Sequence, residues 1–312
     1  MSILLDETNR ILVQGITGHM GTFFVTDARR YGTQVIAGVS PGRGGANVEG
    51  VPVFNGVAAA CRETGADTAM VFVPPAAVRG ATVEAIEAGC RLVVATADEL
   101  PVRDAIEIRA AARANGARFV GPNTPGLISP GNAKMGFMPS FCYSRGPVGV
   151  ISRSGSLSYE ACKRLTLAGI GQSTVVGIGG DPVKGTTAAE ALELFHTDPE
   201  TLAVLYLGEI GGSEEAAVAA YAARAGAKPV AALIVGATAP PGKKMGHAAA
   251  LVGSHADSHA AKTRMLKHAG VRVASGLSQM VKSTQSALSA VRIPSPSAGN
   301  ATMLPSPLMG ED

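Results

Sequence analysis

The chain has 312 residues, of which 46% are hydrophobic and 16% are charged, and this predicts two domains with sizeable cores rather than a disordered chain. A net charge of +3 with 4% aromatic residues does not favour nucleic-acid binding, and no apolar run reaches the roughly 18 residues of a membrane span. The N-terminus resembles no signal peptide, and four scattered cysteines without a C-x-x-C pair are expected to be reduced and mostly buried, so we expect a cytoplasmic protein.

Short apolar runs alternate with amphipathic stretches in the first half of the chain, as in βαβ units of a parallel sheet. Strands are expected over 11–13, 35–39, 68–73, 92–95 and 118–120. Helices are expected from about 22 to 30, over 76–88 and over 101–115, where Pro101 occupies a favoured helix start. The fold class predicted for this half is α/β.

The turn after the first strand carries Gly15, Gly18 and Gly21, a G-x-x-G-x-x-G spacing. Glycines there would free backbone N–H groups at a helix N-terminus to hold a phosphate. The spacing is not the G-x-G-x-x-G of dinucleotide sites, so it favours a phosphate-bearing ligand without identifying it.

The end of the second strand lacks the acidic residue that an NAD site uses to hold the ribose. Arg43 stands there instead, in a glycine-rich loop, and favours a phosphorylated ribose, as in NADP or coenzyme A (CoA). A plain surface turn with a solvated arginine is the alternative. After the fourth strand, Thr96, Ala97 and Asp98 lie where open parallel sheets bind ligands, although Asp98 could equally cap the next helix.

Residues 123–147 are rich in Pro, Gly and Ser and are interpreted as a segment connecting residues 1–122 to residues 148–292. In the second half, strands are expected over 148–151, 174–178, 203–207, 229–235 and 271–273, and helices over 155–168, from about 213 to 224, and over 277–290. The tail 293–312, with its Ser/Pro repeats, is expected to be disordered.

His247 stands between a basic loop and a run of small apolar residues, and imidazole is well suited to accept and release a charged group near neutral pH. Glu209, in a Gly-Glu-Ile-Gly-Gly turn, could accept the Nδ1 proton of His247 and leave Nε2 as a nucleophile. At another strand end, Ser154, Gly155 and Ser156 open a helix and would supply donors to a phosphoryl group. Each has a simpler explanation, Ser154 as a helix N-cap and Glu209 as a solvated acid, and their joint placement favours phosphoryl handling.

The chain resembles the family of succinyl-CoA synthetase (succinate–CoA ligase) alpha subunits from Met1 to about Ala290, and it is similar to malate–CoA ligase alpha subunits. The resemblance rests on ordered motifs: Gln-Gly-Ile-Thr-Gly at 14–18, Pro-Gly-Arg-Gly-Gly at 41–45, Gly-Pro-Asn at 121–123, Ser-Arg-Ser-Gly-Ser-Leu at 152–157, Gly-Ile-Gly-Gly-Asp-Pro at 177–182, Gly-Glu-Ile-Gly-Gly at 208–212 and Met-Gly-His-Ala at 245–248. It implies a Rossmann-like CoA-binding domain followed by a flavodoxin-like ligase domain.

The resemblance also implies roles for particular residues. CoA contacts are expected from Thr17, Gly18, His19, Met20, Arg43, Thr96, Ala97 and Asp98. Tyr159 matches a substrate-contacting position, His247 the phosphohistidine, and Glu209 its paired acid. Arg43 replaces a lysine of the family, which keeps the charge and changes the geometry at a phosphate.

The resemblance implies a beta subunit with an ATP-grasp site for ATP or GTP and Mg²⁺, in a heterodimer or heterotetramer; no metal site is expected on this chain. The expected reaction passes a phosphoryl group from the nucleotide to His247 and on to a dicarboxylate, and CoA then attacks the acyl phosphate. The acid could be succinate or malate, and the sequence does not decide between them. His255 and His259 could share a helix face, but they are interpreted as solvated residues rather than a metal pair.

Two alternatives come from other classes of function. An NADP-dependent oxidoreductase would explain the Rossmann-like half and Arg43, yet it leaves the phosphate-friendly loops of the second half without a purpose. A non-catalytic CoA-binding module is the other, and the Glu209/His247 pair speaks against it.

Overall fold

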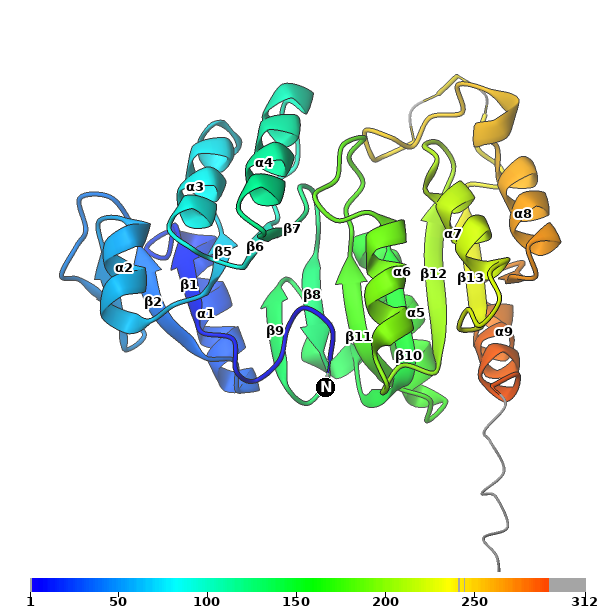
Figure 1. Ribbon diagram of the computed structural model, residues 1–312, viewed down its shortest axis with the longest axis horizontal. Coiled ribbons are helices and arrows are strands. Elements are labelled where there is room, and N and C mark those ends of the chain that lie inside the picture. Colours follow the sequence, from blue (N-terminus) through cyan, green and yellow to red (C-terminus); the bar gives the residue numbers. More distant parts are fainter. Residues whose placement is uncertain (1, 241, 244, 292–312) are drawn as a thin grey trace, which may run out of the picture.

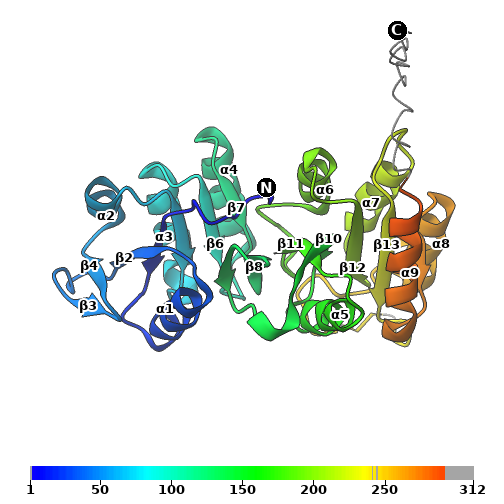
Figure 2. The same cartoon turned by 90° about the horizontal axis from the view of Figure 1, so that it is seen from below.

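The computed structural model describes residues 2–240, 242–243 and 245–291, and in this part of the chain two seven-stranded sheets lie side by side (Figure 1). Helices cover both faces of each sheet, as the view from below shows (Figure 2). The α/β class and the two-part architecture predicted from the sequence are confirmed.

The first sheet has the strand order β3-β4-β2-β1-β5-β6-β7, and only β3 runs antiparallel to its neighbour. Without β3 this is the Rossmann order 3-2-1-4-5-6. All six strands are parallel, and the order in which the chain adds them changes sides between β1 and β5. Its elements are β1 (Ile11–Gln14), α1 (His19–Tyr31), β2 (Val35–Val39), β3 (Asn47–Val48), β4 (Val51–Phe54), α2 (Val57–Thr64), β5 (Thr68–Val71), α3 (Pro75–Glu87), β6 (Leu92–Ala95), α4 (Val102–Ala114) and β7 (Arg118–Val120).

The second sheet has the order β14-β13-β12-β10-β11-β8-β9, with β8 and β9 antiparallel at one edge. Its five parallel strands follow the flavodoxin order 2-1-3-4-5, as expected. Its elements are β8 (Gly126–Ser129), β9 (Ala133–Gly136), η1 (Ser140–Cys142), β10 (Arg145–Ser152), α5 (Gly155–Leu167), β11 (Gln172–Gly177), α6 (Ala188–Thr197), β12 (Ala203–Glu209), α7 (Glu214–Ala222), β13 (Val230–Val235), η2 (His255–Asp257), α8 (His259–His268), β14 (Arg272–Ala274) and α9 (Leu277–Ser289).

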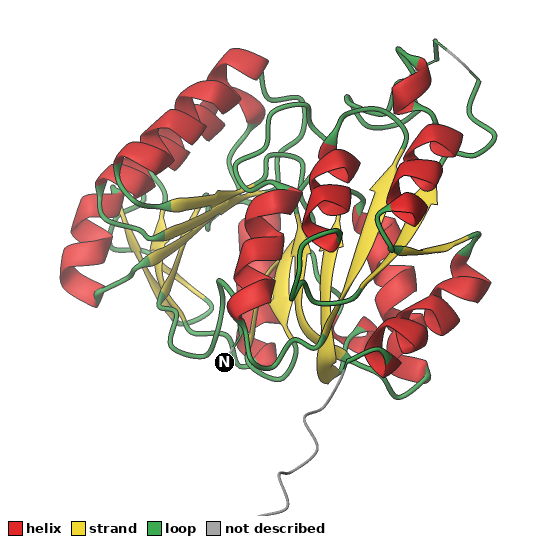
Figure 3. Ribbon diagram, turned by 45° about the vertical axis from the view of Figure 1, so that its right-hand side comes forward, coloured by secondary structure: helices red, strands yellow, loops and turns green. Residues whose placement is uncertain are grey.

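The central strands are continuous apolar runs because helices cover both of their faces (Figure 3). In β12, the side chains of residues 203–207 are fully buried. Helix α6 packs Phe195 into this core and begins with a capping box, in which Thr187 and Glu190 bond each other's backbone N–H groups.

The segment 123–147, interpreted as a connection, contributes β8 and β9 to the second sheet. Helices α2, α6 and α8 were also missing from the sequence interpretation. His255 and His259 share no helix face, because His255 lies in η2 and His259 begins α8. The domain limits 1–122 and 148–292 stay a prediction, and the tail 293–312 lies outside the described residues.

The two sheets are joined by buried polar contacts between β9 and the end of α1. Thr33 Oγ1 accepts a hydrogen bond from the backbone N–H of Lys134 at 3.0 Å, and the fully buried ammonium of Lys134 pairs with Asp27. Cys90, Cys142 and Cys162 are buried and Cys61 is partly buried, all as free thiols, as expected. Among the described helices, none has the length and apolarity needed to cross a membrane.

Candidate active site

His247 lies in the loop between β13 and η2, beside the carboxyl end of β12. Its Nδ1 atom is 2.9 Å from Oε2 and 3.1 Å from Oε1 of Glu209, the last residue of that strand. A carboxylate only accepts hydrogen bonds, so in the neutral ring Nδ1 carries the proton and Nε2 keeps its lone pair. The side chain of His247 is 28% exposed and that of Glu209 is 8% exposed, which leaves the ring open to a reactant while its partner is enclosed.

The hydrogen bond to Glu209 raises the pKa of His247 above its ordinary value, and partial burial opposes this rise. The charge of Glu209 and that of Asp181 raise this pKa further, whereas Arg153 lowers it. The imidazolium is therefore stabilised by the carboxylate that also orients the ring.

Arg153 holds the Glu209 turn from within the protein, with a side chain that is 1% exposed. Its Nη2 lies 3.1 Å from Glu209 Oε1, and its Nη1 donates to the carbonyl oxygens of Glu209 at 3.2 Å and Gly211 at 2.7 Å. The guanidinium thus fixes both the carboxylate and the backbone that carries it. Sequence reasoning gave Arg153 no role.

Two glycines let the His247 loop pack against the strand-end turns. A Cβ at Gly180 would lie 2.4 Å from Cγ of His247, so the imidazole packs directly on the backbone there. Gly211 has a φ of +74°, and a Cβ on it would lie 2.0 Å from the carbonyl oxygen of Ala249. Only glycine fits either position without displacing the loop.

Ser154 is the N-cap of α5, and its Oγ accepts a hydrogen bond from the N–H of Leu157 at 3.4 Å. The simpler interpretation of Ser154 is therefore confirmed. Gly155 and Ser156 begin α5 two and three residues after Arg153, which contacts Glu209 and so brings this helix start near the Glu209 turn. Their role as a phosphate cradle stays a prediction.

The predicted CoA turn opens on a cavity of about 600 Å³ along α1. Thr17, Gly18, His19 and Met20 are exposed, and Thr17 and His19 line this cavity. Thr17 Oγ1 lies 2.9 Å from Ser40 Oγ, which ties the turn to the end of β2.

The glycines of this turn are required by close packing. Gly15 has a φ of +78°, and a Cβ on it would lie 2.3 Å from the carbonyl oxygen of Phe72. A Cβ on Gly21 would lie 2.3 Å from the carbonyl oxygen of Gly15. The G-x-x-G-x-x-G spacing thus folds the turn tightly onto β5 and the start of α1.

The other predicted CoA residues lie at neighbouring strand ends of the first sheet. Arg43 is exposed in the loop between β2 and β3. Thr96 and Ala97 are half-buried after β6, and Asp98 is exposed. Asp98 does not cap α4, whose N-cap is Pro101 without a side-chain hydrogen bond.

Asn123 links the CoA segment to the His247 site, and sequence reasoning gave it no such role. Its N–H donates to the carbonyl oxygen of Ala97 at 2.8 Å, and its Nδ2 donates to Asp181 Oδ1 at 2.9 Å. Its own carbonyl oxygen accepts from the N–H of Gly180 at 3.2 Å, and Gly180 touches the His247 ring. Its φ of +52°, rare for a residue with a side chain, was not visible in the sequence.

Tyr159 lines a cavity of about 390 Å³ together with Phe23, Phe137 and Phe141. Its hydroxyl donates to the carbonyl oxygen of Phe137, and burial raises its pKa. The predicted contact with substrate stays a prediction.

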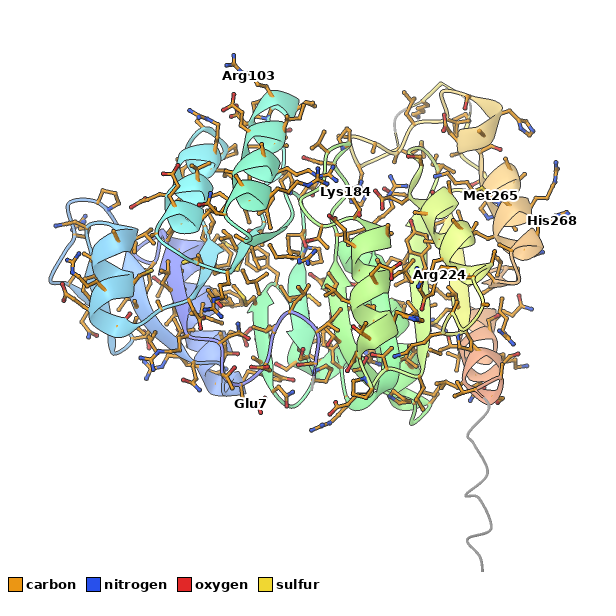
Figure 4. All side chains as sticks on the ribbon, in the orientation of Figure 1. Glu7, Arg103, Lys184, Arg224, Met265 and His268 are labelled. Carbon is orange, nitrogen blue, oxygen red and sulfur yellow. The ribbon has the colours of Figure 1, made fainter. Side chains whose placement is uncertain are left out.

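Another cavity, of about 350 Å³, lies beside the His247 loop and is lined by Lys184, Glu214, Asp257 and Ala249 among others. Figure 4 labels Lys184 in the loop that follows β11. Its Nζ donates to the carbonyl oxygen of Asp181 at 2.7 Å, and burial lowers its pKa. No group of three or more metal-ligating side chains occurs within the described residues.

Comparison with known proteins gives two matching family models. A CoA binding domain model matches residues 6–98, and a CoA-ligase model matches residues 151–282. The first range contains the turn at 17–20, Arg43 and Thr96–Asp98, and the second contains Arg153, Glu209 and His247.

Curated relatives match most of the chain, and two of them show the range of their names. The alpha subunit of an ADP-forming succinate–CoA ligase from Aquifex aeolicus is 49% identical over 275 residues, which cover 88% of this chain and 90% of the relative. The alpha subunit of a malate–CoA ligase from Methylorubrum extorquens is 46% identical over 278 residues, which cover 88% of this chain and 94% of the relative.

Among solved structures, ATP citrate lyase from Methanothrix soehngenii aligns with a TM-score of 0.85 at 21% identity. The alignment covers 92% of this chain, and the chain spans half the length of that protein. This likeness establishes that the two proteins share the fold.

Proposed function

Since this chain belongs to the family of succinate–CoA ligase alpha subunits, we propose that it is the alpha subunit of a nucleotide-dependent acid–CoA ligase. The observation that carries the proposal is the His247–Glu209 pair, in which the acid binds Nδ1 and Nε2 is left free. The match to the CoA binding domain model supports CoA as a substrate and leaves the oxidoreductase alternative without support.

In the first step, Nε2 of His247 attacks the γ-phosphorus of ATP or GTP, and the nucleoside diphosphate leaves. Phosphorylation at Nε2 leaves the ring cationic while Nδ1 keeps its proton, and the Glu209 carboxylate 2.9 Å away stabilises that cation. Arg153 keeps the carboxylate in place. The N-terminus of α5, with Gly155 and Ser156, would donate N–H groups to the phosphoryl oxygens.

In the second and third steps, a carboxylate oxygen of the acid attacks the phosphorus and His247 returns to its neutral form. The CoA thiolate then attacks the carbonyl carbon of the acyl phosphate, and inorganic phosphate leaves. CoA would bind at Thr17–Met20, Arg43 and Thr96–Asp98. Asn123 joins this last segment to the loop under His247, so the thiol and the phosphoryl carrier share one framework.

Succinate is the proposed acid, with malate as the alternative, because curated relatives of both names match the chain at similar identity. Tyr159 is proposed to contact the acid. A beta subunit is proposed to supply an ATP-grasp site that binds the nucleotide and Mg²⁺, in a heterodimer or heterotetramer. A cytoplasmic location stays a prediction.

The test is phosphorylation of the complex with its beta subunit by ATP labelled at the γ-phosphate. We expect acid-labile label on the wild-type chain and none on His247→Ala. His268→Ala, a change at an exposed histidine of α8 (Figure 4), is the matched control and should label like the wild type. Undiminished acid-labile label on His247→Ala contradicts the proposal.

A further inference from the structure

A second buried layer lies beneath the Glu209 turn, and its centre is Lys262 of α8. The side chain of Lys262 is 2% exposed, and its Nζ donates to the carbonyl oxygens of Glu209 at 2.9 Å and Gly211 at 2.5 Å. The same Nζ lies 2.5 Å from Oε2 of Glu215, which is fully buried in α7. All three donors of the ammonium are thus directed at the turn and at one acid.

The partner of Lys262 is itself held in place. Tyr206 donates its hydroxyl hydrogen to Glu215 Oε1 at 2.9 Å, and Nη1 of Arg153 lies 3.6 Å from the same oxygen. A buried acid with three such partners is a fixed counter-ion. Burial lowers the pKa of Lys262, and Glu215 opposes that decrease.

The His247 loop is fastened at both ends to the turn that Lys262 holds. At its start, Val235 of β13 pairs with Glu209 of β12. At its end, the carbonyl oxygen of Asp257 accepts a hydrogen bond from the N–H of Gly211 at 3.0 Å, and α8 follows with Lys262. The position of the ring relative to its acid therefore depends on the 209–211 turn.

We propose that Lys262, paired with Glu215, is a positioning residue for the chemistry of His247: it holds the carbonyl oxygens of Glu209 and Gly211 and so aims the Glu209 carboxylate at Nδ1. The reaction it serves rests on the function proposed above. The Nζ of Lys262 bonds the turn and Glu215 rather than the imidazole, so its effect on His247 passes through the turn.

The variant that tests this role is Lys262→Met with Glu215→Gln. The single change would leave Glu215 as an unpaired buried acid and endanger folding, whereas the pair removes both charges. Glutamine still accepts the hydrogen bond of Tyr206. The matched control is Arg224→Met with Glu193→Gln, which removes an exposed ion pair of 2.5 Å (Arg224 is labelled in Figure 4).

The readout is the titration of His247, followed by NMR of the full-length chain with labelled histidines and assigned with His247→Gln. The charged groups that act on this ring are Glu209, Arg153 and Asp181, and those that act on Lys262 are Glu215, Arg153, Asp257 and the Glu209 turn. The double variant changes no charge next to the ring. A loosened turn should lower the pKa of His247 toward its ordinary value, and the control should leave it unchanged.

A second readout is the initial rate of phosphorylation in the complex with the beta subunit. Misplacement of the ring by about 1 Å should slow phosphorylation about 10- to 100-fold in the double variant. The single variant Lys262→Arg keeps the charge and the hydrogen-bond donors, so it should be phosphorylated at a rate close to that of the wild type.

The outcomes separate this inference from the proposed function. If the wild-type chain never takes up phosphate, the proposed function fails, and the titration still decides the role of Lys262. Glu215→Asp, which keeps every charge and withdraws the carboxylate from Lys262, serves if the double variant does not fold. The inference is overturned if the pKa of His247 in the folded double variant equals that of the wild type. If the double variant does not fold, the same result for Glu215→Asp overturns it.

Discussion

The turn after β1 and the turn after β12 are both strand-end sites of parallel sheets, yet they use their polar groups in opposite ways. At the first, residues 17–20 and Arg43 are exposed, and Thr17 and His19 line an open cavity. At the second, the side chains of Arg153 and Glu215 are at most 1% exposed and bond other groups of the chain. A site for a ligand that arrives from solvent keeps its polar side chains exposed, whereas a site that orients one nucleophile buries them against other groups of the protein.

The largest effect that distinguishes the two regions should come from Arg153→Met. This change leaves Glu209 and Glu215 buried with one fewer cation, and we expect the free energy of unfolding to fall by about 3–5 kcal/mol in urea denaturation. Arg224→Met removes an exposed partner of Glu193 and should cost at most about 1 kcal/mol. If Arg153→Met and Arg224→Met lower the free energy of unfolding equally, the buried ion pairs contribute no more to stability than an exposed ion pair.

Gly180→Ala should separate the two regions by function. The new Cβ would lie 2.4 Å from Cγ of His247 and force the ring away from Glu209, so we expect phosphorylation to slow about 10- to 100-fold while CoA affinity is retained. In the control Gly253→Ala, the Cβ would lie 3.6 Å from Asp257 Oδ2, which is an ordinary contact. Labelling rates and CoA titration calorimetry measure both. Unchanged labelling of Gly180→Ala would show that the ring needs no contact with this backbone.

Arg43→Ala should have the opposite effect to Gly180→Ala, because it should change the affinity for CoA alone. The exposed guanidinium is expected to bind a phosphate of CoA, so its loss should weaken CoA binding about tenfold. The unfolding transition should stay in place. Arg103→Ala, at an 88% exposed side chain of α4 (Figure 4), is the control. If both variants bind CoA equally in calorimetry, Arg43 is a solvated surface residue.

The smallest effect expected is a pH dependence of stability at His247. Its pKa is raised in the folded chain, so its contribution to stability is complete below the ordinary pKa of about 6.5 and is lost as the pH rises through the raised value. The stability difference between wild type and His247→Gln should therefore shrink from pH 6 to pH 9, by less than about 1 kcal/mol because part of the ring faces solvent. Urea denaturation at both pH values measures this difference, and a difference that grows with pH would contradict the assigned partner.

The sequence was informative where one local pattern decides the structure. Glycines at 15 and 21 predicted a tight turn, which the structure contains, and the run 203–207 predicted a strand, which the structure extends to Glu209. The chemistry of the two side chains predicted the pairing of Glu209 with His247, the resemblance implied it as well, and the 2.9 Å hydrogen bond is consistent with it.

The sequence was uninformative where the partner lies far along the chain. Arg153 and Lys262 both bond the carbonyl oxygen of Glu209, more than fifty residues away from each, and no local spacing predicts such pairs. Helix α6 is different, because the Thr187–Glu190 capping box was a readable local signal. The strands β8 and β9 were not predicted, because the glycines and prolines around them are typical of loops.

The placement of β8 and β9 bears on how this protein could be recombined with its relatives. The two strands precede residue 151, where the CoA-ligase match begins, yet they form the edge of the second sheet. A chimera that took its front half up to residue 150 from another protein would import a foreign sheet edge. It would also replace Asn123, whose backbone and amide bridge the two halves. A crossover at residues 121–122, between β7 and β8, would leave β7 in the first sheet and carry Asn123, β8 and β9 with the second sheet.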